Sequence, residues 1–176
     1  MSSQSVPSPF PLDKIWTSGN YTGRFLPRSD TRTLFMGDYT GSCMRIGGAN
    51  EDGVKWAQNS PDAGFFVIEH EKSKEVLAGS RVWNDRESNS TCVNSIQTKG
   101  EEGRLKIILE IYKQVAESLV SDGLTERVAL GKSRIDFPGA FGLQPLPRSQ
   151  FVQTPQDIQG LTDCSESQWL LAGQSS

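Results

Sequence analysis

The residues best suited to chemistry lie between a predicted strand and the longest predicted helix of the chain. Gly100 and Gly103 flank a short turn there, and Lys99, Arg104 and Lys106 surround it with positive charge. Glycine adopts backbone conformations closed to other residues, so such a turn can leave N–H groups pointing outward at the positive end of the helix dipole. The spacing therefore predicts a binding site for an anion, such as the phosphate of a ligand.

A second interpretation of the same turn stays open. Glu101 and Glu102 lie between the two glycines, where they would repel a phosphate unless their side chains turn away. Acidic residues in the first turn of a helix stabilise it through the helix dipole without any ligand. The turn is thus either an anion site or a capped helix start.

Histidine and metal chemistry are limited by composition. The single histidine, His70, lies in a charged stretch typical of a solvent-exposed turn, and a Ser-His-Asp or Cys-His site would have to use it. We interpret it as an exposed loop residue. With one histidine and no C-x-x-C pair, the chain lacks the ligand set of a usual structural zinc site, so we predict no metal site.

Three cysteines, Cys43, Cys92 and Cys164, are odd in number and far apart in the sequence. This argues against a disulfide framework and suits a reducing compartment. Cys43 lies in a glycine-rich loop, where it is either a reactive thiol or a small buried apolar residue.

The elements that must position these residues are clearest in the middle of the chain. Two β-rich runs, residues 65–69 and 76–83, are separated by a charged stretch and predict a hairpin. A third run, residues 91–96, predicts the next antiparallel strand. A long amphipathic helix follows and ends at Gly123, and residues 127–135 then predict a strand parallel to the third one. The apolar stripe of the helix comprises Leu105, Ile108, Ile111, Tyr112, Val115 and Leu119.

The flanking segments are poorer in pattern. Residues 1–11 are rich in serine and proline and predict a disordered tail, which leaves residues 12–176 as a single domain. Residues 16–64 predict loops, one short strand and at most one short helix near residues 42–46. Near the C-terminus, only residues 165–172 look able to form a last helical turn or two.

Composition excludes several classes of protein. A length of 176 residues fits one domain, and 35% hydrophobic residues together with 17 glycines exclude a wholly disordered chain. A net charge of −3 excludes attachment to nucleic acid by bulk charge. No run is apolar enough for a membrane span, and the N-terminus lacks the features of a signal peptide, so we predict a cytoplasmic protein without membrane attachment.

The order of these elements resembles the centre of the GNAT superfamily of acyl-CoA-dependent N-acyltransferases. The family's turn follows the pattern Q/R-x-x-G-x-G/A, and the run from Gln97 to Gly100 matches its first half. Glu102 stands where the second Gly or Ala is expected, and Gly103 comes one residue late. The resemblance covers roughly residues 64–135. It implies an α/β (α+β) fold with a mixed, mostly antiparallel sheet, a long central helix and loop-rich terminal segments.

The resemblance also implies a coenzyme site. Residues 65–69 or 76–83 would splay from residues 91–96, so that unpaired backbone groups bind the pantetheine arm of acetyl-CoA or another acyl-CoA as an added strand. Backbone amides from Lys99 to Arg104 would hold the pyrophosphate at the helix start. The residues expected to bind the coenzyme are Ile96, Gln97, Lys99, Gly100, Gly103 and Arg104.

Catalysis in such an enzyme needs three functions. A strand N–H near Ile96 would polarise the acyl carbonyl, and Glu69 is the first candidate for the base that deprotonates the amine. The alternative for Glu69 is an exposed hairpin carboxylate. Many relatives protonate the leaving thiolate with a tyrosine after the next strand, but none follows Tyr112 here. Ser133 or a water would have to serve.

Two functional hypotheses therefore stay open. The first is an acyltransferase that moves an acetyl or acyl group from acyl-CoA to the amine of a small molecule or a protein. The second is a catalytically inactive binding or accessory module of the same fold without a cofactor. The half-matched turn favours the second hypothesis, and the order of elements favours a coenzyme site.

Overall fold

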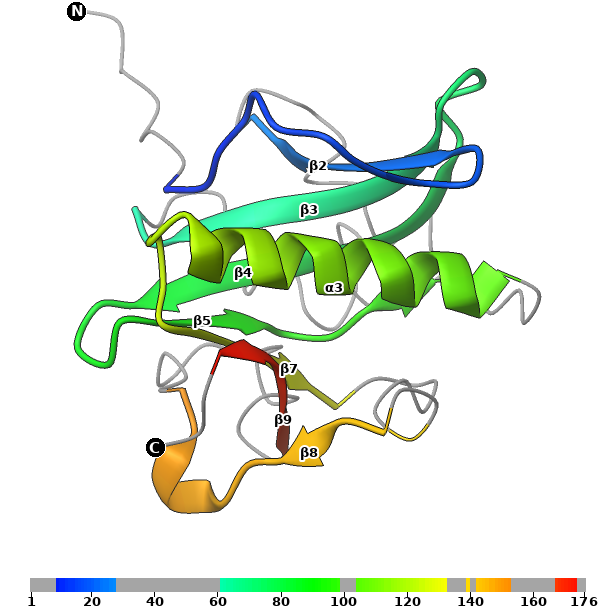
Figure 1. Cartoon of the computed structure of the whole chain (residues 1–176). Coiled ribbons are helices and arrows are strands. Elements are labelled where there is room, and N and C mark those ends of the chain that lie inside the picture. The colour runs from blue at the N-terminus through cyan, green and yellow to red at the C-terminus, as the bar shows by residue number, and fades with distance from the viewer. Residues whose placement is uncertain are drawn as a thin grey trace, which may run out of the picture.

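The computed structural model describes residues 9–27, 61–98, 104–132, 139, 142–152 and 167–173. One helix and one mixed sheet dominate this part of the chain (Figure 1). The elements, in chain order, are β1 Trp16–Ser18, β2 Tyr21–Leu26, β3 Ala63–His70, β4 Val76–Asp85, β5 Ser90–Val93, β6 Gln97–Thr98, α3 Leu105–Ser121, β7 Arg127–Gly131, β8 Gln144–Pro145, the 3₁₀ helix η2 Arg148–Gln150 and β9 Gln168–Gly173. None of the helices in these ranges is long and apolar enough to cross a membrane.

The sheet has the strand order β1-β2-β3-β4-β5-β7-β9-β8, and β6 continues the pairing of β5 along β4. Every pair of neighbours is antiparallel except β5 and β7, which run parallel and are joined through α3. A parallel pair needs a long crossover connection, and a helix usually provides it. The predicted strand after the helix, parallel to the third strand, is confirmed in β7.

The predicted hairpin is confirmed as β3 and β4, which are the central strands of the sheet. Both are apolar over most of their length, and nearly every residue of β3 is buried. A strand covered on both faces reads as a continuous apolar run rather than an alternating one. Aromatic residues divide between the faces: Phe66 packs on the side of α3, and Phe65 and Trp83 on the other.

Helix α3 lies across one face of the sheet with its apolar stripe inward (Figure 1). The predicted stripe is confirmed, since all its members are buried except the half-buried Leu105. The helix approaches β2 closely at Gly23, where an added Cβ would lie 2.5 Å from Ile111 Cγ2. Asp122 caps the C-terminus, and Gly123 follows with a positive φ of 76°, as the predicted helix end requires.

Two predictions for the flanking segments are wrong. Residues 16–26 form two strands, β1 and β2, where the sequence predicted loops and a single short strand. The segment predicted as a final helical turn forms β9, because pairing with both β7 and β8 gives its backbone a ladder on each side. The short helix predicted near residues 42–46 lies outside the described residues.

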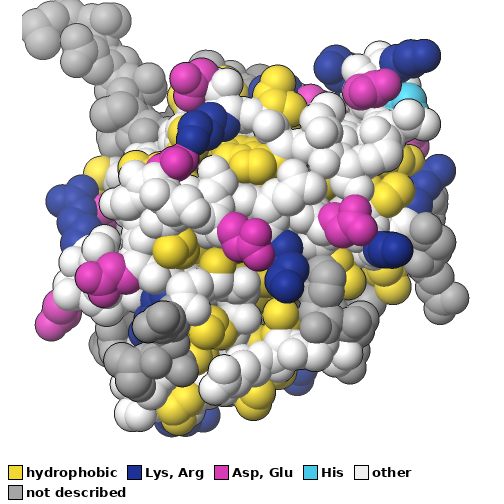
Figure 2. All heavy atoms as spheres, in the orientation of Figure 1, with side chains coloured by type: hydrophobic (Ala, Val, Ile, Leu, Met, Phe, Trp, Pro, Cys, Tyr) yellow, Lys and Arg dark blue, Asp and Glu magenta, His cyan; other side chains and the backbone are white. Residues whose placement is uncertain are grey.

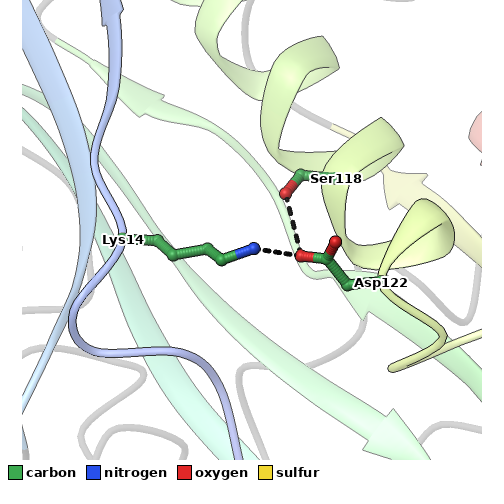
Figure 3. A network of polar contacts seen from close by, with 3 residues as sticks. All are labelled: Lys14, Ser118 and Asp122. Carbon is green, nitrogen blue, oxygen red and sulfur yellow. Dashed lines mark hydrogen bonds and ion pairs between the residues drawn. The ribbon is translucent and has the colours of Figure 1, made fainter.

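The N-terminal segment is attached to the C-terminal end of α3. Lys14 forms an ion pair with Asp122, which also accepts a hydrogen bond from Ser118 on the helix (Figure 3). Phe10, inside the predicted tail, is 5% exposed and stacks on Phe25 with ring centroids 4.7 Å apart. The packed core therefore includes at least one residue of the segment before position 12.

Candidate active site

A β-bulge interrupts the sheet directly before the predicted coenzyme turn. Residues 82–85 of β4 pair in register with β5, and residues 78–79 pair with β6. Between these ladders, Ser80 and Arg81 face three residues, Asn94, Ser95 and Ile96. One extra residue on one strand defines a bulge, which turns the local backbone out of the regular pairing. We call residues 78–81 and 94–98 the bulge end of this sheet region, and residues 82–93 the hairpin end.

Parallel pairing also stops at the bulge. The four pairs between β5 and β7 run from Ser90–Arg127 to Val93–Leu130. After Val93 the chain stays with β4 through β6, and β7 ends one residue later, at Gly131. Residues 94–98 therefore run beyond the last pair with β7.

This geometry corrects the predicted position of the splay. β3 and β4 pair along their whole length, with one bulge after Ile68, and β4 pairs with β5 and then β6. Residues 65–69 and 76–83 therefore do not separate from each other or from the third strand. β5 pairs with β7 over all four of its residues, and this pairing ends at Val93.

Two buried hydroxyl groups hold the bulge from the side of α3. The Ser80 hydroxyl donates to the Ser95 carbonyl oxygen at 2.6 Å, and the Tyr112 hydroxyl lies 2.6 Å from Ser80 Oγ. The Gln97 amide donates to Ser95 Oγ. All of Ser80, Ser95 and Tyr112 are at most 2% exposed. These side-chain bonds add to a backbone hydrogen bond across the bulge, from the N–H of Asn94 to the Arg81 carbonyl oxygen at 3.0 Å.

Burial raises the pKa of Tyr112 above its ordinary value. The phenol therefore stays protonated at neutral pH and can act as a donor. Its ring packs edge-on against Phe66, with centroids 5.2 Å apart. Both the ring and the hydroxyl of Tyr112 are fixed inside the core.

Helix α3 begins at the end of the predicted coenzyme turn. Its N-cap residue is Arg104, which makes no side-chain capping hydrogen bond, and its first turn holds no acidic residue. The described helix starts at Leu105, and Glu101 and Glu102 lie outside the described residues, so the alternative in which they stabilise the helix start stays a prediction. The predicted positive charge at the helix start is present in Arg104, which is exposed.

A cavity of about 310 Å³ lies beside this helix start. Its walls come from β2, the β3–β4 hairpin and Arg104, whose guanidinium lies 5.4 Å from the centroid of the Tyr21 ring. His70 meets the other side of the site, with its ring edge-on to Tyr21 at 5.3 Å. The remaining lining residues are Ser73, Glu75, Val76 and Leu77.

His70 lies at the end of β3 and is half-buried, so it is more enclosed than the exposed turn residue that the sequence predicted. Its Nδ1 accepts hydrogen bonds from the backbone N–H groups of Lys72 and Ser73, at 3.2 and 3.3 Å. These bonds give the histidine a structural role in the hairpin turn.

Glu69, the predicted base, is buried rather than exposed. It is 1% exposed, and its Oε1 accepts from Nε of Arg24 at 2.9 Å. Both side chains lie on the face opposite α3. Arg24 shares a face of β2 with Leu26, and Glu69 shares a face of β3 with Val67. Leu26 and Val67 both pack in the core on the side of the sheet away from α3. The alternative of an exposed hairpin carboxylate is therefore wrong, because the ion pair with Arg24 balances the buried charge.

The predicted site residues divide into three groups. Three of them lie on either side of the expected coenzyme turn: Ile96 and Gln97 at the bulge end, and Arg104 at the start of α3. Glu69 lies two strands away, since Val67 faces Gly79 and Gly79 faces Gln97. Four residues lie outside the described part of the chain: Lys99, Gly100, Gly103 and Ser133.

Sequence reasoning missed the contribution of Ser80 and Tyr112. The prediction that Tyr112 belongs to the apolar stripe of the helix is confirmed. A buried tyrosine hydroxyl needs a hydrogen-bond partner, and this requirement could have predicted a polar contact at Tyr112. Ser80 sits in an apolar run, where a lone hydroxyl also needs a buried partner.

The prediction against disulfides is also corrected. Cys92, which is 0% exposed on β5, takes part in a disulfide bond, and its partner lies outside the described residues. An odd number of widely spaced cysteines argues against a disulfide framework but does not exclude a single bond. Cys43 lies outside the described residues, so its two interpretations stay as they were.

Charge on the helix face is mixed. Figure 2 shows acidic and basic side chains interspersed over the face that carries α3, with no single sign gathered there. This arrangement agrees with the low net charge of −3. Specific recognition at the helix start therefore depends on local groups rather than on a broad field.

Comparisons with known proteins bear on this geometry. No protein-family model matches the chain, and neither does any curated protein. Solved structures do match. Ribosomal-protein-S5-alanine acetyltransferase from Vibrio fischeri is similar over 90% of this chain and 94% of its own, with a TM-score of 0.53 and 12% identity.

Two further structures show the same likeness. A GCN5-related N-acetyltransferase from Brucella melitensis is similar over 87% of this chain and 78% of its own, with a TM-score of 0.51 and 17% identity. A ribosomal L7/L12 alpha-N-protein acetyltransferase in complex with coenzyme A is similar over 89% of this chain and 95% of its own, with a TM-score of 0.56 and 8% identity. The curled, mostly antiparallel sheet, the parallel β5–β7 pair and the crossing helix α3 thus give this chain the fold of the GNAT acetyltransferases.

Proposed function

We propose that this chain is an acyltransferase that moves an acyl group from acyl-CoA to an amine acceptor. The observation that carries the proposal is the bulge end of the sheet. A bulge on one strand, the end of parallel pairing with the next and the start of a long helix occur together within residues 93–105. Many structures with this fold are acetyltransferases, and one of them is in complex with coenzyme A.

The coenzyme would bind beyond the last pair between β5 and β7, Val93 with Leu130. Its pantetheine arm would lie beside residues 94–98 as an added strand, and its pyrophosphate would meet the amides at the start of α3. Gln97, Lys99, Gly100, Gly103 and Arg104 are the proposed binding residues. Arg104 supplies a guanidinium there, and guanidinium groups pair well with phosphate.

The acyl carbonyl would be polarised by the backbone N–H of Ile96. The amine nitrogen then attacks the carbonyl carbon, a C–N bond forms, the C–S bond breaks and the sulfur leaves as a thiolate that takes up a proton. A backbone donor aimed at the developing oxyanion is a usual source of such stabilisation. Residues 94–96 are all buried, so the thioester reaches them only when the chain around them gives way.

Glu69 is the proposed base, acting at a distance. Two strand spacings, about 10 Å, separate its strand from β6, so the amine proton would have to reach the carboxylate through water. The ion pair with Arg24 gives the buried Glu69 carboxylate a partner of opposite charge. Ser133 or a water is proposed to protonate the leaving thiolate.

The proposed class of acceptor is taken from acetyltransferases with the same fold. Similar structures include acetyltransferases named for a ribosomal protein and for spermidine. Both a protein N-terminus and a polyamine present an amine, and we propose an amine of either a small molecule or a protein as the acceptor. A cytoplasmic location stays a prediction from the sequence.

The second candidate is an inactive module of the same fold. It is favoured by the burial of residues 94–96 and by the engagement of Glu69 with Arg24, which together leave the polarising amide covered and the base occupied. Such a module would bind a partner without turning over acyl-CoA.

Calorimetric titration of the full chain with acetyl-CoA separates the two candidates. The enzyme proposal expects saturable binding in the micromolar range, and no heat of binding at hundreds of micromolar would remove it. Gly100→Glu should weaken binding at least tenfold, about 1.4 kcal/mol, because a carboxylate would face the pyrophosphate. An unchanged affinity would move the site away from this turn.

Turnover tests the catalytic part. Release of the free thiol of coenzyme A should depend on an added amine, with spermidine and a short peptide with a free N-terminus as the first probes. Glu69→Gln should lower kcat more than KM, because the base acts after binding. Binding without amine-dependent thiol release for any amine would favour the inactive module.

A further inference from the structure

We propose that the cavity beside the start of α3 binds a small organic anion, a carboxylate or phosphate group carried on an apolar body. Tyr21, His70 and Arg104 are the proposed anion-binding residues. Arg104 also belongs to the proposed coenzyme site, and the other described residues of the cavity wall do not. The cavity is therefore a second ligand site next to the first, suited to an anion that regulates acyl transfer.

The cavity has the size and the wall chemistry of a site for one small molecule. Its volume of about 310 Å³ is at the lower end of the range that ligand pockets occupy, about 300–1,000 Å³. Val76 and Leu77, each 8% exposed, contribute apolar wall together with the ring of Tyr21. Polar groups reach this apolar surface from separate elements: β2, the β3–β4 hairpin and the start of α3. A few convergent polar groups on an apolar wall are typical of a ligand pocket.

The hydroxyl of Tyr21 is the first group in the cavity that calls for a partner. Tyr21 is 8% exposed, and its hydroxyl makes no hydrogen bond to any residue in the described ranges. A buried tyrosine hydroxyl usually has a hydrogen-bond partner. The oxygen is accessible, since the unpartnered polar atoms that the protein seals off do not include it. Because Tyr21 lines the cavity, a ligand there can supply the partner.

His70 contributes a donor whose position is fixed by the hairpin turn. Its Nδ1 accepts from the backbone N–H groups of Lys72 and Ser73, at 3.2 and 3.3 Å. A neutral imidazole carries one proton, so these two bonds place the proton on Nε2. Within the part of the chain that the structure describes, Nε2 has no hydrogen-bond partner. The ring lies edge-on to Tyr21 at 5.3 Å, so the N–H and the hydroxyl belong to neighbouring walls of one cavity.

Charge decides which ligand these groups favour. The Arg104 guanidinium is held 5.4 Å from the centroid of the Tyr21 ring, and its several N–H groups can bind an anion while it keeps its other contacts. As the N-cap of the 17-residue α3, Arg104 also lies at the positive end of the helix dipole. Glu75 is the one acidic residue among the described residues of the wall, and it is exposed, so solvent screens its charge. A cationic ligand would meet the guanidinium and the Nε2–H of His70, neither of which can accept a hydrogen bond from it.

The test uses the imidazole of His70, because the chain contains only one histidine. A long-range ¹H–¹⁵N correlation spectrum of the full chain should show the proton on Nε2, and a proton on Nδ1 would overturn the donor assignment. Titration with phenyl phosphate or with benzoate should move the Nε2 resonance and reach saturation at millimolar concentrations or below. The probe that binds more tightly distinguishes a phosphate from a carboxylate ligand.

Two further probes separate the charge of the ligand from its apolar body. Benzamide has the body without the charge, and inorganic phosphate has the charge without the body. Each should bind at least tenfold more weakly than the tighter of phenyl phosphate and benzoate. Equal binding of benzamide would overturn the assignment of an anion, and equal binding of inorganic phosphate would overturn the role of the apolar wall.

Variants assign the binding to the cavity. Tyr21→Phe keeps the ring under the Arg104 guanidinium and removes only the hydroxyl, so it should weaken phenyl phosphate binding at least threefold. Tyr112→Phe is the matched control, since it also removes a buried phenol hydroxyl but lies outside the cavity, and it should leave the affinity unchanged. Glu75→Gln removes the opposing charge and should strengthen binding about twofold. Equal losses in the two tyrosine variants, or weaker binding in Glu75→Gln, would overturn the inference.

Acetyl-CoA separates this site from the proposed coenzyme site. Two ligands that both draw on Arg104 should oppose each other, so saturating phenyl phosphate should weaken acetyl-CoA binding by a limited factor, about threefold to tenfold. A weakening that keeps growing in proportion to phenyl phosphate would overturn the second site, because both ligands would then occupy the same place. Binding of phenyl phosphate to a chain that does not bind acetyl-CoA would support this inference and remove the proposed function. An Nε2 resonance that neither anion moves would overturn this inference and leave the proposed function standing.

Discussion

The two ends of the β4–β5 region are held by different kinds of hydrogen bond. At the hairpin end, four residues of β4 pair in register with β5, which pairs in turn with β7. At the bulge end, hydroxyl groups of Ser80 and Tyr112 join the backbone bond from Asn94 to Arg81, and the register between β5 and β7 ends at Val93. The first region is held by regular strand pairing, and the second adds a buried side-chain hydrogen bond to the Ser95 carbonyl.

This difference separates stability from function along a single strand. The hairpin end is a fully paired scaffold, and side-chain substitutions there act on the free energy of unfolding. The bulge end adds one residue that regular pairing does not need, and bulges are common next to active sites. The following predictions test that division, from the largest expected effect to the smallest.

Trp83→Ala should cause the largest loss of stability. Trp83 is 1% exposed at the hairpin end and lies opposite Cys92, so its removal leaves a large cavity in the core. The expected cost is about 3–5 kcal/mol in the free energy of unfolding, measured by urea denaturation. Under conditions where the variant is folded, its affinity for acetyl-CoA should stay within twofold of wild type. A large loss of affinity would contradict the proposed division, in which the hairpin end determines stability and the bulge end determines binding.

Gly23→Ala should affect both ends, because it disturbs the helix that spans them. The added Cβ would lie 2.5 Å from Ile111 Cγ2 and 2.5 Å from Phe66 Cζ, so α3 must move away from β2. Overpacking of this kind costs about 1–3 kcal/mol. Affinity for acetyl-CoA should fall together with the unfolding midpoint. A loss of stability without a loss of affinity would show that acetyl-CoA binding at the helix start does not depend on how α3 packs against β2.

Arg104→Glu should weaken acetyl-CoA binding about tenfold, about 1.4 kcal/mol, with little change in stability. Arg104 is exposed at the helix start, where a carboxylate would repel the pyrophosphate. Lys113→Glu is the matched control, since it makes the same change in charge on an exposed position of α3 away from the start. Equal losses in both variants, measured by calorimetry, would assign the effect to overall charge.

Asp122→Asn should have the smallest effect. Its hydrogen bond with Lys14 lowers the pKa of Asp122, but both side chains are exposed and the pair is screened by solvent. A lowered folded-state pKa gives stability that is present above the unfolded pKa of about 4 and lost as the pH falls through the folded value. The small difference in melting temperature between the variant and wild type should therefore vanish in acid. A difference that persists at low pH would need another cause.

Much of the fold could be predicted from local pattern. The hairpin, the amphipathic helix and the strand parallel to β5 each depend on periodicity within one segment, and each is confirmed. β9 could not be predicted in this way, because its strand form depends on pairing with β7 and β8, which are distant in sequence. Tertiary pairing overrides weak local preference in such segments.

The site could be predicted only in outline. The long helix after the third strand is confirmed, but the predicted splay of residues 65–69 or 76–83 from residues 91–96 is wrong. The position of a splay depends on register, and register at the bulge depends on a single extra residue that no composition pattern marks. The burial of Glu69 was missed for a related reason, since its partner Arg24 lies on β2, 45 positions away in the sequence.

Hydrogen–deuterium exchange with and without acetyl-CoA tests the central claim most directly. If the bulge end and the start of α3 bind the coenzyme, acetyl-CoA should slow amide exchange in peptides covering residues 94–106. Peptides covering residues 84–91 at the hairpin end should be unaffected. Unchanged exchange throughout at saturating acetyl-CoA, or slowing confined to the hairpin end, would contradict the account.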